Sequence, residues 1–214
     1  MRIPRAAPAL IALFAGSALG AQTLHPSASA SLVWARVRSQ KSAGTDYLSG
    51  PAFLGQGTLA MRRLQLTVTY LQGTVNQDGP LGASRNLVEG TVQLGFRPLD
   101  WLTLETGPHA RAYSSTGATE RWAFWELRAR AETAFVGSAV RGYAELWRVV
   151  AANVNVPESF GHGQGGEVGM ILRLARAPLA ARVGYRIDHA VLGGGTRLET
   201  VDGVVVGVGL SGLP

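Results

Sequence analysis

The stretch RWAFWELRARAETAF, residues 121–135, alternates between two kinds of side chain. One set is apolar or small: Trp125, Leu127, Ala129, Ala131, Thr133 and Phe135. The other set is charged: Glu126, Arg128, Arg130 and Glu132. Successive residues of a β-strand point to opposite faces, whereas a helix would spread these charges around its whole circumference. The stretch therefore predicts a strand with one charged and one apolar face.

The same alternation recurs along most of the chain. Comparable splits into a charged and an apolar set occur in the ranges 87–97, 101–113, 139–150, 166–175 and 179–191. In 197–211, valines alternate with small residues, and in 29–38, Val33, Ala35 and Val37 oppose Trp34, Arg36 and Arg38. A period of two that is repeated this often predicts an all-β protein.

The connections between these segments suggest how the strands are joined. Short connections at 98–100, 136–138 and 176–178 alternate with longer polar ones at 73–86, 114–120, 152–165 and 192–196. Transmembrane β-barrels have short periplasmic turns and longer external loops. Splitting the run 52–72 at Arg62-Arg63 gives strands at 52–61 and 64–72. The sequence then predicts an antiparallel, up-and-down transmembrane β-barrel of about ten strands with both termini in the periplasm; eight strands is the alternative.

The first residues have the layout of a secretory signal peptide. Arg2 and Arg5 precede an apolar stretch from Ala6 to about Ala18, and small residues follow up to Ala21. A membrane anchor is the alternative, but the apolar stretch is shorter than the roughly 20 residues that a spanning helix needs. We expect residues 1–21 to be removed and 22–214 to form a single barrel domain.

Composition excludes several classes of protein. The chain has no cysteine, so it has no disulfide, no thiol chemistry, no thiolate zinc site and no lipid anchor on cysteine. Its net charge is +6, or 6 − 2 = +4 without Arg2 and Arg5. Lys41 is the only lysine, and the arginines are interleaved with glutamates. This pattern predicts no nucleic-acid partner, because no basic stripe for phosphates is present.

An apolar and a charged face would also suit a soluble β-sandwich, in which the apolar face is the core. Two features favour a membrane barrel. The charged sets are rich in arginine and glutamate, which form bidentate pairs in a confined lumen. Aromatic residues also lie near the ends of the apolar sets, as in the aromatic girdles of membrane barrels. We place Phe96 and Phe135 at the periplasmic rim and Tyr70, Trp125 and Tyr185 towards the external rim.

With these features, residues 22–214 resemble the bacterial outer-membrane β-barrel proteins. The segment 96–104, FRPLDWLTL, resembles the strand–turn–strand units of that class. The resemblance implies a location in the outer membrane of a Gram-negative-type envelope, in contact with its lipid. Many such proteins end in an aromatic residue, whereas this sequence ends LSGLP.

The strongest candidate site is the charged face, which a barrel would turn towards its lumen. Its members are Glu89, Glu105, Arg111, Glu126, Arg128, Arg130, Glu132, Arg141, Glu145, Arg173, Arg182 and Arg186. We expect these charges to pair and fill a narrow lumen, which gives a structural role. A porin-like, narrow pore of weak anion preference, for ions or small molecules, is the alternative. The oligomeric state is left open.

Candidates for catalysis are few. His109 shares the charged face with Glu105 and Arg111, and with a serine nucleophile it would make a lipid-modifying enzyme. Omptin proteases, which are ten-stranded barrels, need an Asp-His pair, but Asp188 and His189 are neighbours and so point to opposite faces. His162, between Glu158 and Glu167, is a weak metal site in a glycine-rich loop. We predict no metal, no cofactor and no enzymatic activity, with loop-based adhesion or binding as a further alternative.

Overall fold

The computed structural model describes residues 24–77, 83–115, 117–137, 139–174 and 177–210; the expected signal peptide lies outside these ranges. Within them the chain forms ten strands and one short 3₁₀ turn, η2 (Gly193–Gly195). The strands are β1 (His25–Lys41), β2 (Gly44–Met61), β3 (Leu64–Gln77), β4 (Ser84–Leu99), β5 (Leu102–Ser114), β6 (Thr119–Val136), β7 (Val140–Val154), β8 (Phe160–Arg173), β9 (Leu179–Leu192) and β10 (Arg197–Leu210). No helix in these ranges is long and apolar enough to cross a membrane.

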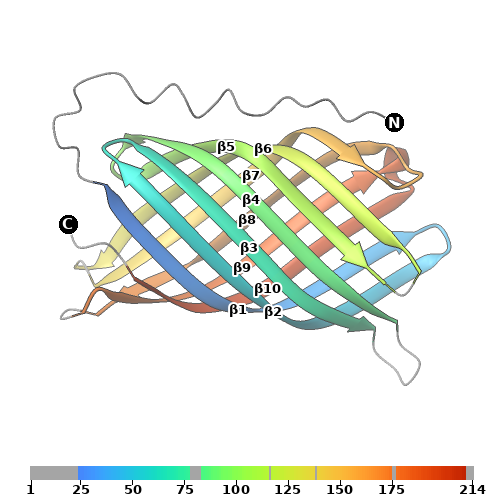
Figure 1. Cartoon of the computed structure of the whole chain (residues 1–214), viewed down its shortest axis with the longest axis horizontal. Coiled ribbons are helices and arrows are strands. Elements are labelled where there is room, and N and C mark those ends of the chain that lie inside the picture. Colours follow the sequence, from blue (N-terminus) through green and yellow to red (C-terminus); the bar gives the residue numbers. More distant parts are fainter. Residues whose placement is uncertain (1–23, 78–82, 116, 138, 175–176, 211–214) are drawn as a thin grey trace.

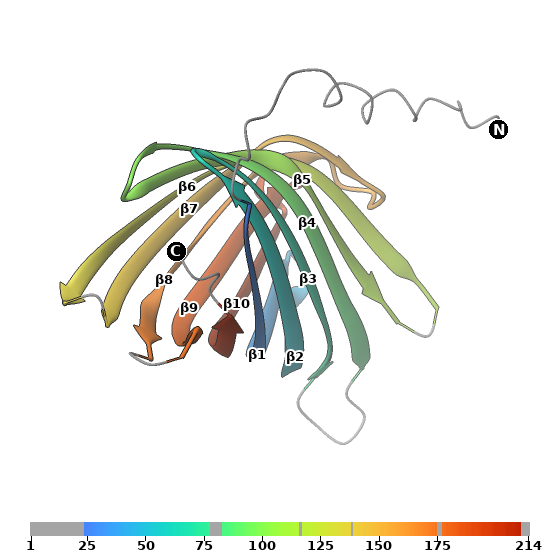
Figure 2. The same cartoon turned by 60° about the vertical axis from the view of Figure 1, so that its left-hand side comes forward.

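The ten strands close into a single antiparallel barrel (Figures 1 and 2). Each strand pairs with its neighbours in sequence, and β1 closes the ring by pairing with β10. Val33 of β1, for example, lies opposite Val205 of β10 and Ala52 of β2. The predicted up-and-down, all-β barrel of ten strands is confirmed, and the eight-strand alternative is wrong.

The split of residues 52–72 decided the strand count, and it is confirmed. β2 ends at Met61 and β3 begins at Leu64, so only Arg62 and Arg63 connect them. Arg62 has a φ of 53°, in the left-handed region that tight turns between antiparallel strands use. The alternating pattern of each strand ends at these two arginines, and the chain reverses its direction there.

The barrel has two distinct ends. We call the end with the start of β1 and the end of β10 the terminal end; the connections there are 62–63, 100–101, 137–139 and 174–178. The opposite, distal end has the connections 42–43, 78–83, 115–118, 155–159 and 193–196. The predicted strict alternation of short and long connections is therefore wrong in two places: 42–43 is a short distal connection, and the terminal connection 174–178 is longer than the distal connections 115–118 and 193–196.

The strands also extend further towards the distal end than predicted. β1 was expected to end near residue 38 and β2 to begin at 52, yet their ladder continues to the pair Lys41–Gly44. The range 158–167 was expected to be a loop, yet Phe160–Arg173 forms β8. The apolar alternation fades before the strands end, because backbone hydrogen bonds between strands do not require apolar side chains.

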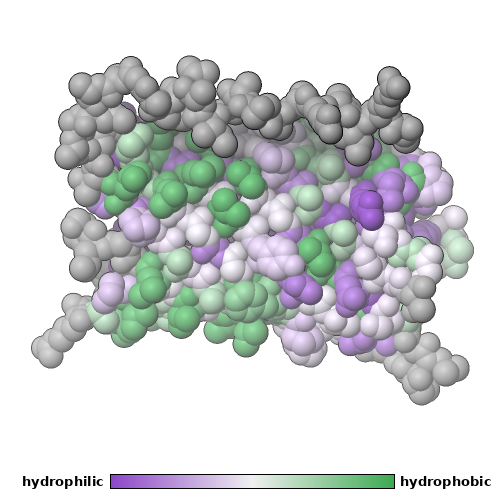
Figure 3. All heavy atoms as spheres, in the orientation of Figure 1, coloured by the Kyte–Doolittle hydropathy of each residue, from purple (hydrophilic) through white to green (hydrophobic). Residues whose placement is uncertain are grey.

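The outer surface carries an apolar belt. Its members are outward-facing side chains such as Leu32, Val68, Leu94, Leu127, Met170 and Val206, which are all exposed. In Figure 3 the hydrophobic residues gather over the half of the barrel towards the terminal end, and hydrophilic ones gather towards the distal end. Exposed apolar side chains on the outer face of a closed barrel are typical of barrels that span a membrane.

In β1 the apolar set of residues faces the lumen, whereas in the charged strands the charged set faces the lumen. The apolar set of β1, Val33, Ala35 and Val37, is buried, while Trp34 and Arg36 face outward. These residues belong to an aliphatic cluster that fills one side of the lumen, with Leu54 and Leu71 among its members. The lumen therefore has an apolar side, formed by β1–β3 with β10, and a charged side.

Candidate functional site

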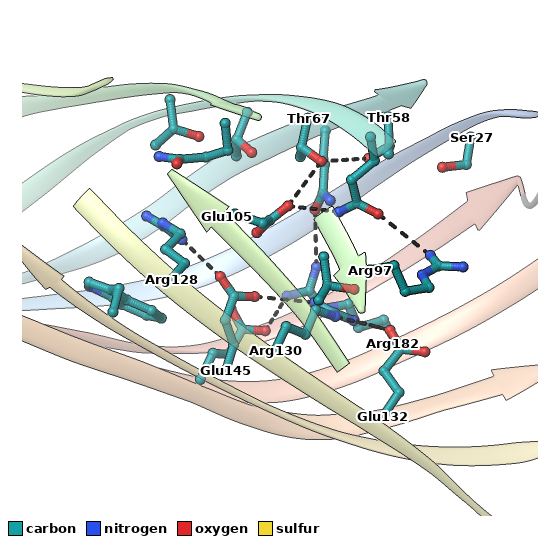
Figure 4. A pocket seen from close by; sticks show the side chains of 18 of the residues that line it. Ser27, Thr58, Thr67, Arg97, Glu105, Arg128, Arg130, Glu132, Glu145 and Arg182 are labelled. Atoms are coloured by element: carbon teal, nitrogen blue, oxygen red, sulfur yellow. Dashed lines mark hydrogen bonds and ion pairs between the residues drawn. The ribbon is translucent and has the colours of Figure 1, made fainter. Parts of the chain in front are cut away.

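The lumen opens at the terminal end into a polar cavity of about 380 Å³, which we call the vestibule. The wall formed by β2, β3 and β4 carries uncharged amides and hydroxyls, including Gln56, Thr67 and Gln93. The opposite wall, from β5 to β9, carries arginines and glutamates. Figure 4 shows Thr67 on one side of the vestibule and Arg128 and Glu145 on the other.

Ion pairs order the charged wall of the vestibule. Arg128 and Arg130 both donate to the Glu145 carboxylate, at 2.9 Å and 3.3 Å. Arg130 also reaches Glu132 at 2.9 Å, and Arg182 pairs with Glu167. Each of these pairs joins residues on one strand or on two nearby strands, so the charges brace the wall that carries them.

Aromatic rings support the same arginines. The guanidinium of Arg128 lies 4.8 Å from the centre of the Trp147 ring, and that of Arg130 lies 4.4 Å from the centre of the Tyr143 ring. The space for both rings comes from glycines: a Cβ on Gly165 would lie 2.5 Å from Trp147, and one on Gly184 would lie 2.4 Å from the Tyr143 hydroxyl. Small lumen-facing residues in β8 and β9 thus accommodate large side chains from β7.

Deeper in the lumen, six side chains form a compact network that we call the central knot. It consists of Glu89, His109, Arg111, Glu126, Arg186 and Asp188. Arg111 donates to Glu89 at 2.7 Å and to Asp188 at 3.1 Å, and Arg186 reaches both carboxylates at 2.8 Å. The Nδ1 atom of His109 lies 2.7 Å from Glu126. The knot links β4, β5, β6 and β9 across the interior of the barrel.

Towards the distal end the lumen contains a second cluster, which we call the distal plug. It consists of Trp122, Phe124, Ala190 and Leu192, against which Val149, Val154, Val156 and Phe160 pack. Trp122 and Phe124 meet edge to face, with ring centres 5.9 Å apart. Arg197 lies over the Trp122 ring and pairs with Glu120 and Glu199 at 2.7 Å and 2.8 Å.

The structure places eleven of the twelve charged residues of the predicted lumen face inside the barrel, and Arg173, which is exposed at the end of β8, at the entrance of the vestibule. Glu89, Arg111 and Glu126 belong to the central knot, Arg186 to both the knot and the vestibule, and the others line the vestibule. The five predicted girdle aromatics, Tyr70, Phe96, Trp125, Phe135 and Tyr185, all face outward and are exposed. Phe96 and Phe135 lie near the terminal ends of β4 and β6.

Sequence reasoning missed several residues of the lumen. Asp188 and Glu167 face the lumen, where they pair with Arg111 and Arg182, but neither was among the twelve predicted residues. Arg197 and Glu199 were not predicted, because the alternation in β10 was identified from valines and small residues, which lie at its other end. The alternation that identified Arg186 also points to Asp188, two residues further on, so that signal was present in the sequence.

The structure gives His109 no catalytic partner of the expected kind. Its side chain is 1% exposed and lies between Glu126 and Glu89, with Phe124 against its ring. In the described part of the chain, the polar contacts of His109 include no serine. Glu105, the carboxylate expected beside His109, accepts a hydrogen bond from Gln65. A histidine buried inside the lumen also has no route to a lipid on the outer surface.

The remaining candidates for chemistry are separated by the fold. Asp188 points into the central knot, whereas His189 bonds to Thr200, outside the knot. Glu158 lies near Arg197, and Glu167 pairs with Arg182. Among the described residues no three histidine, aspartate or glutamate side chains are grouped to hold a metal ion.

Comparison with known proteins places the fold. No protein-family model matches the chain, and no curated protein matches it. Among solved structures, the outer membrane protease OmpT from Escherichia coli matches with a TM-score of 0.59 at 6% identity, over 87% of this chain and 96% of that one. The translocator domain of the autotransporter NalP from Neisseria meningitidis matches with a TM-score of 0.49 at 11% identity, over 90% of both chains.

The chain has the fold of a bacterial outer-membrane β-barrel. The predicted resemblance to that class is therefore confirmed at the level of architecture. At 6% identity the likeness to OmpT concerns the fold alone. Any function for this barrel has to be argued from its own lumen and surface.

Proposed function

We propose that this protein is exported and serves as a structural, non-conducting barrel of the outer membrane. The observation that supports the proposal most directly is the filling of the lumen by two successive layers. The central knot spans the interior at mid-height, and the distal plug lies beyond it, towards the distal end. The vestibule is then a pocket with one entrance and no exit.

The packing of these layers argues against passage of ions. Glu126 and Trp122 are each 1% exposed, and Arg111 is 4% exposed. An ion crossing the knot would have to separate buried ion pairs, and breaking one such pair costs about 3–5 kcal/mol. The apolar plug beyond adds a barrier for any hydrated ion. These layers support a sealed barrel held by charge pairing.

We also propose an orientation with the terminal end in the periplasm. Transmembrane barrels have short periplasmic turns and project further on the external side. The polar distal extensions of the strands fit that external position, and the vestibule would then open to the periplasm. The distal connections span at most six residues, 78–83, which provides little loop surface for adhesion.

A narrow pore remains the second candidate, because the vestibule opens at one end and its lining contains more arginines than carboxylates. Conductance in planar bilayers distinguishes the two functions. For the sealed barrel we expect no single-channel steps from the wild type. Steps with an anion preference in the wild type would contradict the sealed barrel and support the pore.

A variant that lacks large side chains in both the central knot and the distal plug tests whether these two layers block conductance. Arg111→Ala combined with Trp122→Ala and Phe124→Ala removes side chains from the knot and the plug, so we expect it to conduct. Trp125→Ala is the matched control, since it removes an aromatic residue of the same strand that faces outward. We expect this control to stay silent, like the wild type.

A further inference from the structure

Gln93 is an unusual residue in the wall of the vestibule. Its side chain is 2% exposed, and neither its amide nitrogen nor its amide oxygen has a hydrogen-bond partner among the described residues. A buried amide offers two donors and an acceptor, and leaving them unpaired is costly. Gln93 lines the vestibule. An unpaired buried amide requires a partner that the protein itself does not supply, such as a water, an ion or a ligand.

The vestibule also offers free cationic groups at its entrance. Among the described residues, the Arg97 side chain makes only a long contact of 3.5 Å, with Gln65, and Arg141 makes only a 3.5 Å pair with Glu132. Arg173 lines the vestibule and has no ion pair in the described part of the chain. Across the whole lining, seven arginines face five carboxylates. The excess positive charge at the entrance favours an anion.

From these observations we propose that the vestibule binds a small anionic sugar, about two residues long, that enters from the terminal end. The uncharged wall supplies the amides and hydroxyls that pair with sugar hydroxyls, and the entrance arginines pair with a carboxylate. A volume of about 380 Å³ lies within the usual range for small-molecule sites. The site does not require the lumen to conduct.

The positions of Gln93 and Arg97 set the length of the ligand. Both lie on β4, four residues apart. At about 3.4 Å per residue, their Cα atoms are roughly 14 Å apart along the strand. One molecule that contacts the Gln93 amide with its hydroxyls and Arg97 with its carboxylate therefore needs the length of about two sugar units.

Lactobionate and lactose make a suitable pair of probes, because both are disaccharide-sized and only lactobionate carries a carboxylate. Binding to the detergent-solubilised full chain is measured by isothermal titration calorimetry. We expect saturable binding of lactobionate that is at least tenfold tighter than that of lactose. No saturable binding of lactobionate, or equal binding of lactose, would overturn the proposal.

Two substitutions test the residues that define the site. Gln93→Leu removes the unpaired amide but keeps a side chain of similar size, so we expect at least tenfold weaker lactobionate binding with an unchanged or higher unfolding temperature. Arg97→Gln should weaken lactobionate binding to near that of lactose and leave lactose binding unchanged. Wild-type affinity in Gln93→Leu would contradict the proposal.

Ser39→Ala is the matched control. Ser39 is buried in the lumen and its hydroxyl also has no partner among the described residues, but it lies near the distal end of β1, outside the vestibule. We expect this variant to bind lactobionate like the wild type. Inorganic phosphate is the last probe: if it binds as tightly as lactobionate, the arginines recognise a simple anion, and the assignment to a sugar is overturned.

Discussion

Arg111 Nε lies 2.7 Å from Glu89 Oε1, and both side chains are buried in the middle of the barrel. The two residues are direct cross-strand partners in the register of β5 and β4. Glu89 also bonds to Arg186 of β9, and Arg111 also bonds to Asp188 of the same strand. The pair Glu89–Arg111, on the adjacent strands β4 and β5, is therefore linked by ion pairs to β9, which is far away in the sequence.

This relationship makes the central knot a sensitive point for stability. We expect Arg111→Met to lower the free energy of unfolding by about 3–5 kcal/mol, because it leaves buried carboxylates without their partner. Urea unfolding in one detergent, followed by tryptophan fluorescence, measures the change.

Arg36→Gln is the control for this prediction. It also removes an arginine from an ion pair, with Asp202, but the Arg36 side chain is 58% exposed. A pair of this kind contributes about 0–1 kcal/mol. If Arg111→Met costs no more than Arg36→Gln, the knot does not stabilise the barrel.

The strands were predictable because their signal is local. A period of two shows in any window of about ten residues, and the pair Arg62-Arg63 marks a reversal without knowledge of the rest of the chain. The alternation does not indicate whether the apolar or the charged set of a strand faces the lumen. In β6 the charged set faces the lumen, whereas in β1 the apolar set does, because its neighbours supply an aliphatic cluster.

The central knot was only partly predictable. Glu89 and Arg111 face each other once the β4–β5 hairpin is known, so their contact follows from neighbouring segments. The contact between Glu89 and Arg186 joins residues 97 positions apart. It depends on the closure and tilt of the barrel, and no sequence window contains that information.

The space that glycines leave for lumen aromatics can be tested directly. In Gly165→Ala the new Cβ would lie 2.5 Å from the Ile187 carbonyl oxygen and 2.5 Å from Trp147. We expect a loss of about 1–3 kcal/mol in the free energy of unfolding, because overpacking forces the backbone or the ring to move. The urea midpoint, measured under one set of conditions, reports the change.

Gly57→Ala is the counterpart in the same barrel. Apart from Gly57 itself and its two chain neighbours, no heavy atom of the described residues lies within 4 Å of the position that its Cβ would take. We expect this variant to be unchanged or to gain about 0.4–1 kcal/mol, since alanine restricts the unfolded chain. If both substitutions lower the free energy of unfolding equally, then the effect of strand glycines on stability does not come from the room that they leave for neighbouring side chains.

The apolar belt predicts a dependence on depth for charges on the outer face. We expect Leu94→Arg to cost about 2–4 kcal/mol in lipid bilayers and Gln72→Arg about 0–1 kcal/mol, because Leu94 lies within the belt and Gln72 lies towards the distal end of β3. Folding titrations in vesicles give both values. Equal costs would contradict the proposed placement of the belt in the bilayer.

The absence of cysteine gives a clean test of orientation. Ala118→Cys places a single thiol in the distal connection 115–118, and Arg63→Cys places one in the terminal turn 62–63. Both positions are exposed and outside the strands, so neither substitution disturbs the lumen or the belt. If the distal end faces the outside of the cell, a membrane-impermeant maleimide added to intact cells labels Ala118→Cys and leaves Arg63→Cys unlabelled until the outer membrane is opened. The reverse pattern would place the vestibule entrance on the cell surface, and the sugar would then enter from outside.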